Sequence, residues 1–329
     1  MKSSMSKISP SAHIENSKLY SSHVAIGKDA RLTDVEIKAR GITVKSGAIL
    51  TGCKLFSDGN IVIGQGTTIK ERTIINAFKS VFIGDYVIID RDVFIGGMQS
   101  ERSAIEVGNQ SVILFRSYLN TTRRIVLGNN VGIGGYCLIF THSAWQNVLE
   151  GNPYKFADVE IKDNSWLPWN VTVLPGVTIE RDATIGSGST VTKNIPQSVF
   201  AAGVPAKIIR QKSSKPPSLE DRSILLQDIL KDFYQYASNY LKLKGLKFCH
   251  KGDMTIEYGN IRMIYTLDFR HFGRNDIVLS FKIPYRIKKQ NMWIELDSKR
   301  SSSSCDLANY FISFVRRYGI KIVPNSSER

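Results

Sequence analysis

Aliphatic residues recur at every sixth position through the first two thirds of this 329-residue chain. Neither an amphipathic α-helix nor an alternating β-strand has this period, whereas a six-residue repeat is typical of a parallel β-helix. Each unit is then a short strand and a turn, and three units close one coil. We therefore expect a stack of about nine coils over residues 8–195. The longest unbroken series is Ile161, Leu167, Val173, Ile179, Ile185 and Val191.

The repeat is interrupted at several places that predict local irregularity. The six-residue count sets Tyr20, Lys38 and Phe56 at core positions, so we expect an irregular second coil around Lys38. Further along, Glu101 falls on a strand position, and a loop is expected at Met98–Ser103. The largest interruption predicts a long loop at about residues 143–159, with a histidine at its base.

A second domain is expected after the β-helix. Residues 211–217 are polar and contain proline, which indicates a linker between a domain at 8–210 and a domain at 218–329. A helix should begin near Ser218, because acidic residues follow in its first turn. Short strand-like segments and a second helix then predict a small α+β domain with an antiparallel sheet. The sequence does not indicate its role.

The chain is strongly basic, with a formal net charge of +15. Residues 212–329 carry 21 basic and 12 acidic side chains, so the excess is densest there. Such a field favours phosphates, acidic glycans or an anionic membrane surface, and no nucleic-acid motif is present. No apolar run approaches the roughly 20 residues of a membrane span, and no apolar leader precedes the repeat. We expect a cytoplasmic protein, with peripheral membrane association possible.

Cysteine and histidine spacing argues against a metal site. The four cysteines show no ligand-like spacing and fit reduced thiols. His13, His23 and His142 are the histidines of the repeat region, and the first two lie many coils from the third. They cannot form a three-histidine zinc site within one layer of coils.

Three segments carry a resemblance to a known family. They are residues 166–179 (WLPWNVTVLPGVTI), 185–196 (IGSGSTVTKNIP) and 201–210 (AAGVPAKIIR), and they resemble the hexapeptide-repeat acyltransferases. The likeness is greatest to O-acetyltransferases of sugars, xenobiotics and bacterial surface polysaccharides, and it covers roughly residues 125–210. It implies a left-handed β-helix, a homotrimer, acetyl-CoA as acyl donor and a site between neighbouring subunits. Residues 212–329 share no such likeness.

Within this resemblance His142 is the candidate general base. Transfer of an acyl group from a thioester to a hydroxyl needs the hydroxyl proton removed, and imidazole titrates in a suitable range. Asn120, about one coil earlier, matches an active-site asparagine of some family members and is a weaker candidate for positioning the acceptor. The alternatives are an ordinary polar corner at His142 and an αL-tolerant corner at Asn120.

The resemblance also suggests donor and acceptor contacts. Trp166 would line the thioester channel, and the backbone of Ser187 and Gly188 would pair with the pantetheine amides. Trp145 in the long loop could stack on a sugar face. The alternatives are a packing tryptophan and a loop anchor. Side chains for the nucleotide phosphates, which could equally form a solvated basic edge, are Thr192, Lys193, Lys207 and Arg210.

The chain departs from the family at Pro168 and Trp169, where glycine and a small residue are usual, so the path of pantetheine is expected to differ there. The sequence therefore predicts an acetyl-CoA-dependent O-acetyltransferase acting on a sugar or surface polysaccharide by direct transfer. Two alternatives stay open: an N-acetyltransferase on a nucleotide-linked amino sugar, and a non-catalytic trimeric scaffold.

Overall fold

The structure is a computed structural model that describes residues 7–212, 217–251, 253–269, 272–302 and 305–324. The chain forms two compact units, residues 1–214 and 215–329. Of the expected linker at 211–217, residues 213–216 lie outside the described part. No helix in the described ranges combines the length and apolar character needed to cross a membrane.

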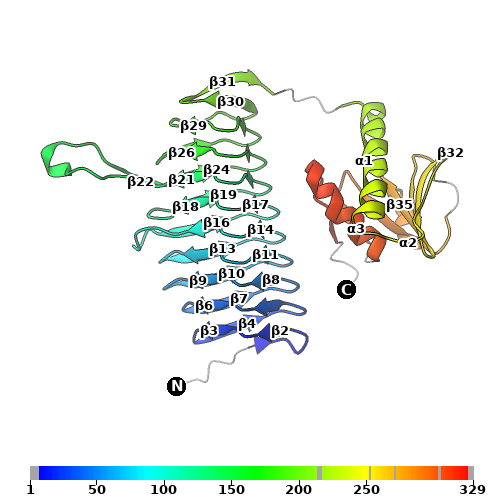
Figure 1. Ribbon diagram of the computed structural model, residues 1–329, viewed down its shortest axis with the longest axis horizontal. Helices are drawn as coiled ribbons and strands as arrows, with labels where there is room; N and C mark the ends of the chain where they lie inside the picture. The colour runs from blue at the N-terminus through cyan, green and yellow to red at the C-terminus, as the bar shows by residue number, and fades with distance from the viewer. Residues whose placement is uncertain (1–6, 213–216, 252, 270–271, 303–304, 325–329) are drawn as a thin grey trace. The chain divides into compact units, whose positions relative to one another are not determined.

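The first unit is a parallel β-helix whose coils stack along one axis (Figure 1). Three sheets, named A, B and C here, form its sides, and successive strands of the chain enter them in turn. Sheet A contains β1 (Lys7–Ile8), β4 (His23–Ile26), β7 (Gly41–Val44), β10 (Asn60–Ile63), β13 (Ser80–Ile83), β16 (Ala104–Val107), β19 (Ile125–Leu127), β24 (Val159–Ile161) and β27 (Thr178–Ile179).

Sheets B and C continue the same order. Sheet B contains β2 (His13–Glu15), β5 (Arg31–Thr33), β8 (Ile49–Thr51), β11 (Thr68–Ile69), β14 (Ile88–Ile89), β17 (Val112–Ile113), β20 (Gly132–Ile133), β25 (Trp166–Leu167), β28 (Thr184–Ile185), β30 (Val199–Gly203) and the antiparallel β31 (Ala206–Gln211). Sheet C contains β3 (Lys18–Tyr20), β6 (Glu36–Lys38), β9 (Lys54–Phe56), β12 (Ile74–Asn76), β15 (Phe94–Ile95), β18 (Tyr118–Asn120), β21 (Leu138–Phe140), β26 (Thr172–Val173) and β29 (Thr190–Val191). The fold class, a left-handed parallel β-helix of about nine coils followed by a small α+β part, is confirmed.

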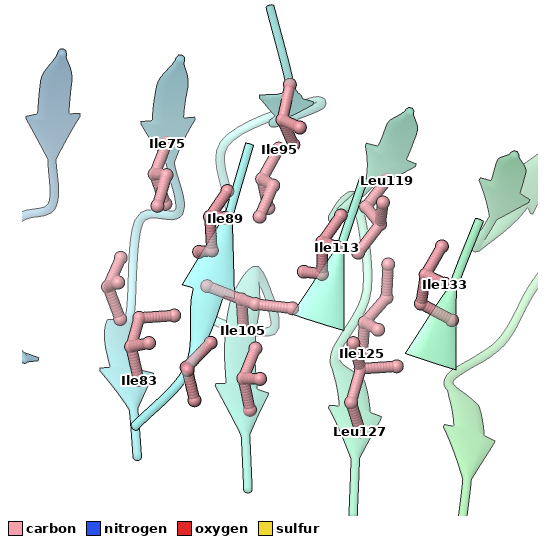
Figure 2. Packing of buried hydrophobic residues seen from close by; sticks show 14 of the residues in the cluster. Ile75, Ile83, Ile89, Ile95, Ile105, Ile113, Leu119, Ile125, Leu127 and Ile133 are labelled. Atoms are coloured by element: carbon pink, nitrogen blue, oxygen red, sulfur yellow. The ribbon is translucent and has the colours of Figure 1, made fainter. Parts of the chain in front are cut away.

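Aliphatic side chains fill the centre of the coils. Figure 2 shows isoleucine and leucine residues from the three sides meeting in one continuous core. Ile113, Leu119 and Ile133 have no exposed surface, and their register partners in adjacent coils are also aliphatic. Corners need a left-handed backbone, which Tyr136 and Gly188 adopt at φ 57° and 71°.

The register of the first coils corrects the six-residue count. Ile37, not Lys38, is the inward residue of β6 and is fully buried, while Lys38 points to solvent. Tyr20 is 50% exposed, and Phe56 is likewise not the inward residue of its strand. The second coil is therefore regular, since the sheet C strand in these coils begins one residue earlier than the count assumed. The inward residues there are Leu19, Ile37 and Leu55.

Two loops leave the edge where sheet C turns into sheet A. The first, residues 96–103, contains Glu101 in an exposed turn and not in a strand position. The second is closed at its root by β22 (His142–Ser143) and β23 (Lys155–Phe156), which pair antiparallel, and it carries the short 3₁₀ helix η1 (Val148–Glu150). It projects well beyond the coil from the end of β22 (Figure 1).

The second unit is a seven-stranded sheet with helices. The expected antiparallel sheet is wrong in part, because the sheet is mixed: β34, β35 and β36 run parallel. Parallel pairing requires a crossover, and part of that role falls to a short helix that the sequence reading missed. The strands are β32 (Lys247–Lys251), β33 (Asp253–Tyr258), β34 (Ile261–Tyr265), β35 (Asp276–Ser280), β36 (Met292–Glu295), β37 (Arg300–Ser301) and β38 (Val323–Pro324), and the helices are α1 (Leu219–Asn239), α2 (Tyr285–Gln290), α3 (Asp306–Val315) and the 3₁₀ helix η2 (Arg316–Tyr318).

Candidate active site

His142 lies where the β-helix gives way to the long hairpin. Strand β21 ends at Phe140, and the antiparallel pairing that follows sets His142 opposite Phe156. The imidazole and the Phe156 ring are stacked, with centroids 5.9 Å apart and planes inclined by 25°. The ring is thus held at the rigid root of residues 144–154 and is not carried on the tip of the loop.

Asn120 contacts the imidazole from the preceding coil, where β18 pairs with β21. The Nδ1 atom of His142 lies 3.0 Å from the side-chain oxygen of Asn120. The same oxygen accepts a hydrogen bond from the backbone N–H of Thr122 at 3.1 Å, and the Asn120 amide nitrogen donates to the Tyr118 hydroxyl at 2.7 Å. Because the backbone N–H can only donate, the amide oxygen is fixed as an acceptor.

This network determines the tautomer of His142. Nδ1 must carry the proton that it shares with the Asn120 oxygen, so the lone pair of a neutral imidazole lies on Nε2. A histidine in this tautomer can accept a proton at Nε2 without breaking its contact to Asn120. The arrangement is therefore suited to general base chemistry.

A buried shell supports the pair. Asn120 is 3% exposed, and Thr122 and Thr141 have no exposed surface. The Thr141 hydroxyl donates to the Asn120 carbonyl oxygen at 2.6 Å. Gly97 packs so closely that a Cβ there would lie 2.7 Å from the Thr122 hydroxyl, so only glycine fits at this position. The loop at 96–103 therefore packs directly against Asn120 and Thr122.

An open groove of about 500 Å³ lies beside the imidazole. Trp145, which we expected to stack on a sugar, lines this groove, and the residue is 99% exposed. An aromatic side chain held in solvent next to a candidate base is available to a ligand, and no described contact anchors it in the loop. The groove is lined by Phe140, His142, Ser143, Ala144, Trp145, Gln146 and Pro153.

Trp166 lies on the outer face of sheet B. A Cβ built on Gly132 would lie 2.2 Å from its ring, so the indole lies flat against the glycine of the preceding coil. The ring remains 38% exposed. Trp169 repeats the arrangement over Gly135, with a Cβ distance of 2.5 Å. Glycine at these two positions thus provides the space that both tryptophans occupy.

The other donor candidates are dispersed over the last coils. Ser187 and Gly188 form an exposed corner between sheets B and C, where the Gly188 N–H donates to the Trp169 carbonyl at 3.0 Å. Thr192 and Lys193 follow β29 at the edge between sheets C and A. The remaining two, Lys207 and Arg210, lie on β31, and Arg210 stacks over Phe200 at 5.7 Å.

One chain does not bring all candidates together. His142 and Asn120 meet at the edge between sheets C and A, whereas Trp166 lies on sheet B and Gly188 at the far edge of sheet C. Different sides of one coil cannot face a common ligand. A site that uses both groups therefore needs a second copy of the chain.

Sequence reasoning missed several neighbours of the base. Thr122 lies in the turn after β18, whereas Tyr118 could have been found from its spacing to Asn120, because alternate residues of a strand share a face. Phe156 and Arg123 could not, since their position depends on how the hairpin closes. Arg123 lies over the Phe156 ring at 4.9 Å.

Cys137 is poorly suited to nucleophilic chemistry. Burial raises the pKa of its thiol to about 11, and the sulfur lies 2.9 Å from the Pro168 carbonyl oxygen. The thiolate, which is the reactive form, is therefore scarce near neutral pH. Among the described residues, no group of three or more His, Cys, Asp or Glu side chains could hold a metal ion.

No protein-family model matches the chain. Galactoside O-acetyltransferase of Escherichia coli (strain K12) is 36% identical over 112 residues, which are 33% of this chain and 55% of that protein. A Schizosaccharomyces pombe protein named as an acetyltransferase, C18B11.09c, is 40% identical over 89 residues, 26% of this chain and 43% of that protein. The chain thus spans about half the length of the curated relatives it matches.

Solved structures give a weaker likeness. The hexapeptide-repeat containing acetyltransferase VCA0836 from Vibrio cholerae has a TM-score of 0.35 and 18% identity, covering 46% of this chain and 74% of that chain. The assignment therefore rests on the sequence matches and on the six-residue register of the coils. By these two criteria, the β-helix of this chain is similar to the hexapeptide-repeat acetyltransferases.

Proposed function

We propose that this chain transfers the acetyl group of acetyl-CoA to a hydroxyl of a sugar or surface polysaccharide, with His142 as general base. The observation that carries the proposal is the contact of His142 Nδ1 with the fixed acceptor oxygen of Asn120, which leaves Nε2 free as a base. The curated relatives named as acetyltransferases support the reaction class.

The chemistry follows from this geometry. Acetyl-CoA supplies the thioester. Nε2 of His142 takes the proton of the acceptor hydroxyl as its oxygen bonds to the thioester carbonyl carbon. When the carbon–sulfur bond breaks, Nε2 returns the proton to the departing sulfur, so that the base is regenerated. Asn120 holds the imidazole and accepts the charge-assisted hydrogen bond from Nδ1 while the ring is cationic.

The donor would lie along the last coils. We assign Trp166, Ser187 and Gly188 to the pantetheine arm, since the indole and the corner backbone are exposed there. The nucleotide phosphates would meet the exposed polar and basic residues near the β-helix end, namely Thr192, Lys193, Lys207 and Arg210. Catalysis would then reside in residues 8–210, with residues 218–329 in a separate domain.

A homotrimer would complete the site. Apolar side chains remain exposed on sheets B and C on both sides of their common edge. If sheet C of one copy faces sheet B of the next, His142 would approach Trp166 of the neighbouring copy. The exposed residues are Ile49, Phe94, Tyr136, Leu138, Trp166 and Trp169.

The decisive test is turnover of acetyl-CoA, followed by release of free thiol, with a panel of glycan, nucleotide-sugar and amino-sugar acceptors. We expect acceptor-dependent release that falls roughly 10²–10⁴-fold in His142→Ala, the usual contribution of a general base, while CoA binding is kept. Unchanged turnover in the variant would refute the base. Acetylation confined to amines would identify an N-acetyltransferase. The absence of any CoA binding would favour a scaffold.

Mixing two inactive variants tests the shared site. His142→Ala and Trp166→Ala chains, unfolded and refolded together, should regain about a quarter of the wild-type sites if each site takes one residue from each of two chains. Sites contained within one chain would regain nothing on mixing.

A further inference from the structure

Arg123 lies beside the candidate base, one coil nearer the N-terminus. Its backbone N–H donates to the Thr141 hydroxyl at 2.9 Å, and its Nη1 donates to the Thr122 carbonyl oxygen at 3.0 Å. Its guanidinium carbon lies 4.9 Å from the centre of the Phe156 ring, on which His142 is also stacked. The cation and the base are therefore held by the same aromatic ring at the root of the hairpin.

The charge of Arg123 is not neutralised within the described residues. No described carboxylate forms an ion pair with it, and its Nε is buried without a hydrogen-bond partner there. Its neighbour Arg124 differs: it donates to both carboxylate oxygens of Glu106, at 2.8 and 2.7 Å. The hydrogen bonds from Arg124 hold the pKa of Glu106 below its usual value. Of two adjacent arginines, one is thus paired and one is left available.

A partly buried cation without a counter-charge is unfavourable unless a ligand supplies the anion. The side chain of Arg123 is also restrained beyond what a merely solvated side chain needs, since a hydrogen bond from Nη1 and an aromatic ring hold the guanidinium. A guanidinium presents a planar set of N–H donors that matches a carboxylate in particular. The net charge of +15 favours acidic molecules over neutral ones at longer range.

We propose that Arg123 binds the carboxylate of an acidic sugar, so that the acceptor is an acidic glycan acetylated close to its carboxylate. This inference rests on the proposed transfer at His142, because it assigns Arg123 to the acceptor of that reaction. Arg123 would position the acceptor and take no proton itself. The alternative ligand for Arg123 is a phosphate of the acyl donor, and the experiment below distinguishes this phosphate from the acceptor carboxylate.

Binding is measured in chains that lack the base, so the result does not depend on acetyl transfer. Full-length His142→Ala, alone and combined with Arg123→Gln, is titrated at constant ionic strength with oligogalacturonates and sialic acid oligomers. The methyl esters of the same oligomers remove the charge of the carboxylates and leave the hydroxyls. Arg124→Gln in the same background is the matched control, because it removes an equal charge one residue away.

We expect His142→Ala to bind at least one of the acids at least tenfold more tightly than its ester, and Arg123→Gln to abolish that preference. Arg124→Gln should keep the preference for the acid over its ester. The affinity for CoA should be the same in both glutamine variants. Arg123→Lys should restore part of the binding, which separates a lost contact from a damaged fold. Equal losses in both glutamine variants, weaker CoA binding in Arg123→Gln, or no preference for any acid would overturn the proposal. Turnover by the unsubstituted chain with neutral acceptors, measured separately, reports on the proposed function itself.

Discussion

Nδ1 of His142 lies 3.0 Å from the side-chain oxygen of Asn120, although 22 residues separate them in the chain. The coils bring the two together, because Asn120 is the register partner of Phe140 in the next coil. The Thr122 backbone N–H fixes which end of the amide faces the imidazole. The structure therefore sets the tautomer of His142 through a backbone hydrogen bond.

Asn120→Asp should shift the acid limb of the pH–rate profile to higher pH. The carboxylate keeps acceptor oxygens for His142 and Thr122, but its charge favours the imidazolium form, so the base is available only at higher pH. Asn120→Ala should instead lower kcat at all pH values and leave the buried Thr122 N–H unpaired. The pH dependence of kcat for both variants checks this, and superimposable profiles for wild type and Asn120→Asp would contradict it.

Gly132→Ala should weaken CoA binding several-fold. The new methyl group would lie 2.2 Å from the Trp166 ring, far inside van der Waals contact, so the indole must leave its place on sheet B. Gly41→Ala is a matched control, since both glycines begin a strand and the methyl group at Gly41 meets only the end of the Asn60 side chain. Isothermal titration of each variant with CoA measures the effect. Equal affinities would show that Trp166 does not contact the donor.

Ile37→Ala should destabilise the β-helix, whereas Lys38→Ala should not. Ile37 is fully buried, and removing its side chain leaves a cavity that typically costs about 2–5 kcal/mol. Lys38 faces solvent, so its removal should change the free energy of unfolding by less than about 0.5 kcal/mol. Denaturant unfolding of the two variants compares them. The reverse order would support the six-residue count over the observed register.

Glu295→Gln should reduce the slope with which the free energy of unfolding of the second unit falls as the pH is lowered. Burial of Glu295 would raise its pKa, but hydrogen bonds from Lys288 and the Ile283 N–H outweigh burial and lower it below the usual value. Its stabilising contribution is therefore present above the unfolded pKa and is lost as the pH falls through the folded pKa. Unfolding free energies from pH 7 downward test this. Asp228→Asn, which removes an exposed pair with Lys231, should leave the slope unchanged.

Thiol labelling should distinguish the buried cysteines from Cys249. Burial raises the pKa of Cys53 to about 12 and that of Cys137 to about 11, so at pH 8 roughly one thiol in a thousand or fewer is ionised at these sites. Cys249 is exposed and should react first with a disulfide reagent. The rate should fall sharply in Cys249→Ser and recover in denaturant. Fast labelling of Cys137 in the folded chain would contradict its burial.

The candidate site was only partly accessible from the sequence. His142 could be singled out because the repeat stops there, and the structure places Asn120 beside it. Their catalytic roles stay predictions. Arg123 and Phe156 carried no periodic signal, since their contact depends on closure of a hairpin that lies outside the repeat. The mixed sheet of the second unit was missed for a related reason, because strand direction depends on long-range crossovers and not on local alternation.

The sequence by itself determined the coil, its length and the residue at which it opens. A six-residue period repeats the same inward direction at every strand, so hydrophobic burial along one axis follows from spacing alone. Only the tertiary structure decided the register of the first coils, the tautomer of His142 and the lack of a carboxylate partner for Arg123 among the described residues. Each of these depends on contacts between coils or across the hairpin, where single hydrogen bonds and ring contacts, and not periodic burial, determine the geometry.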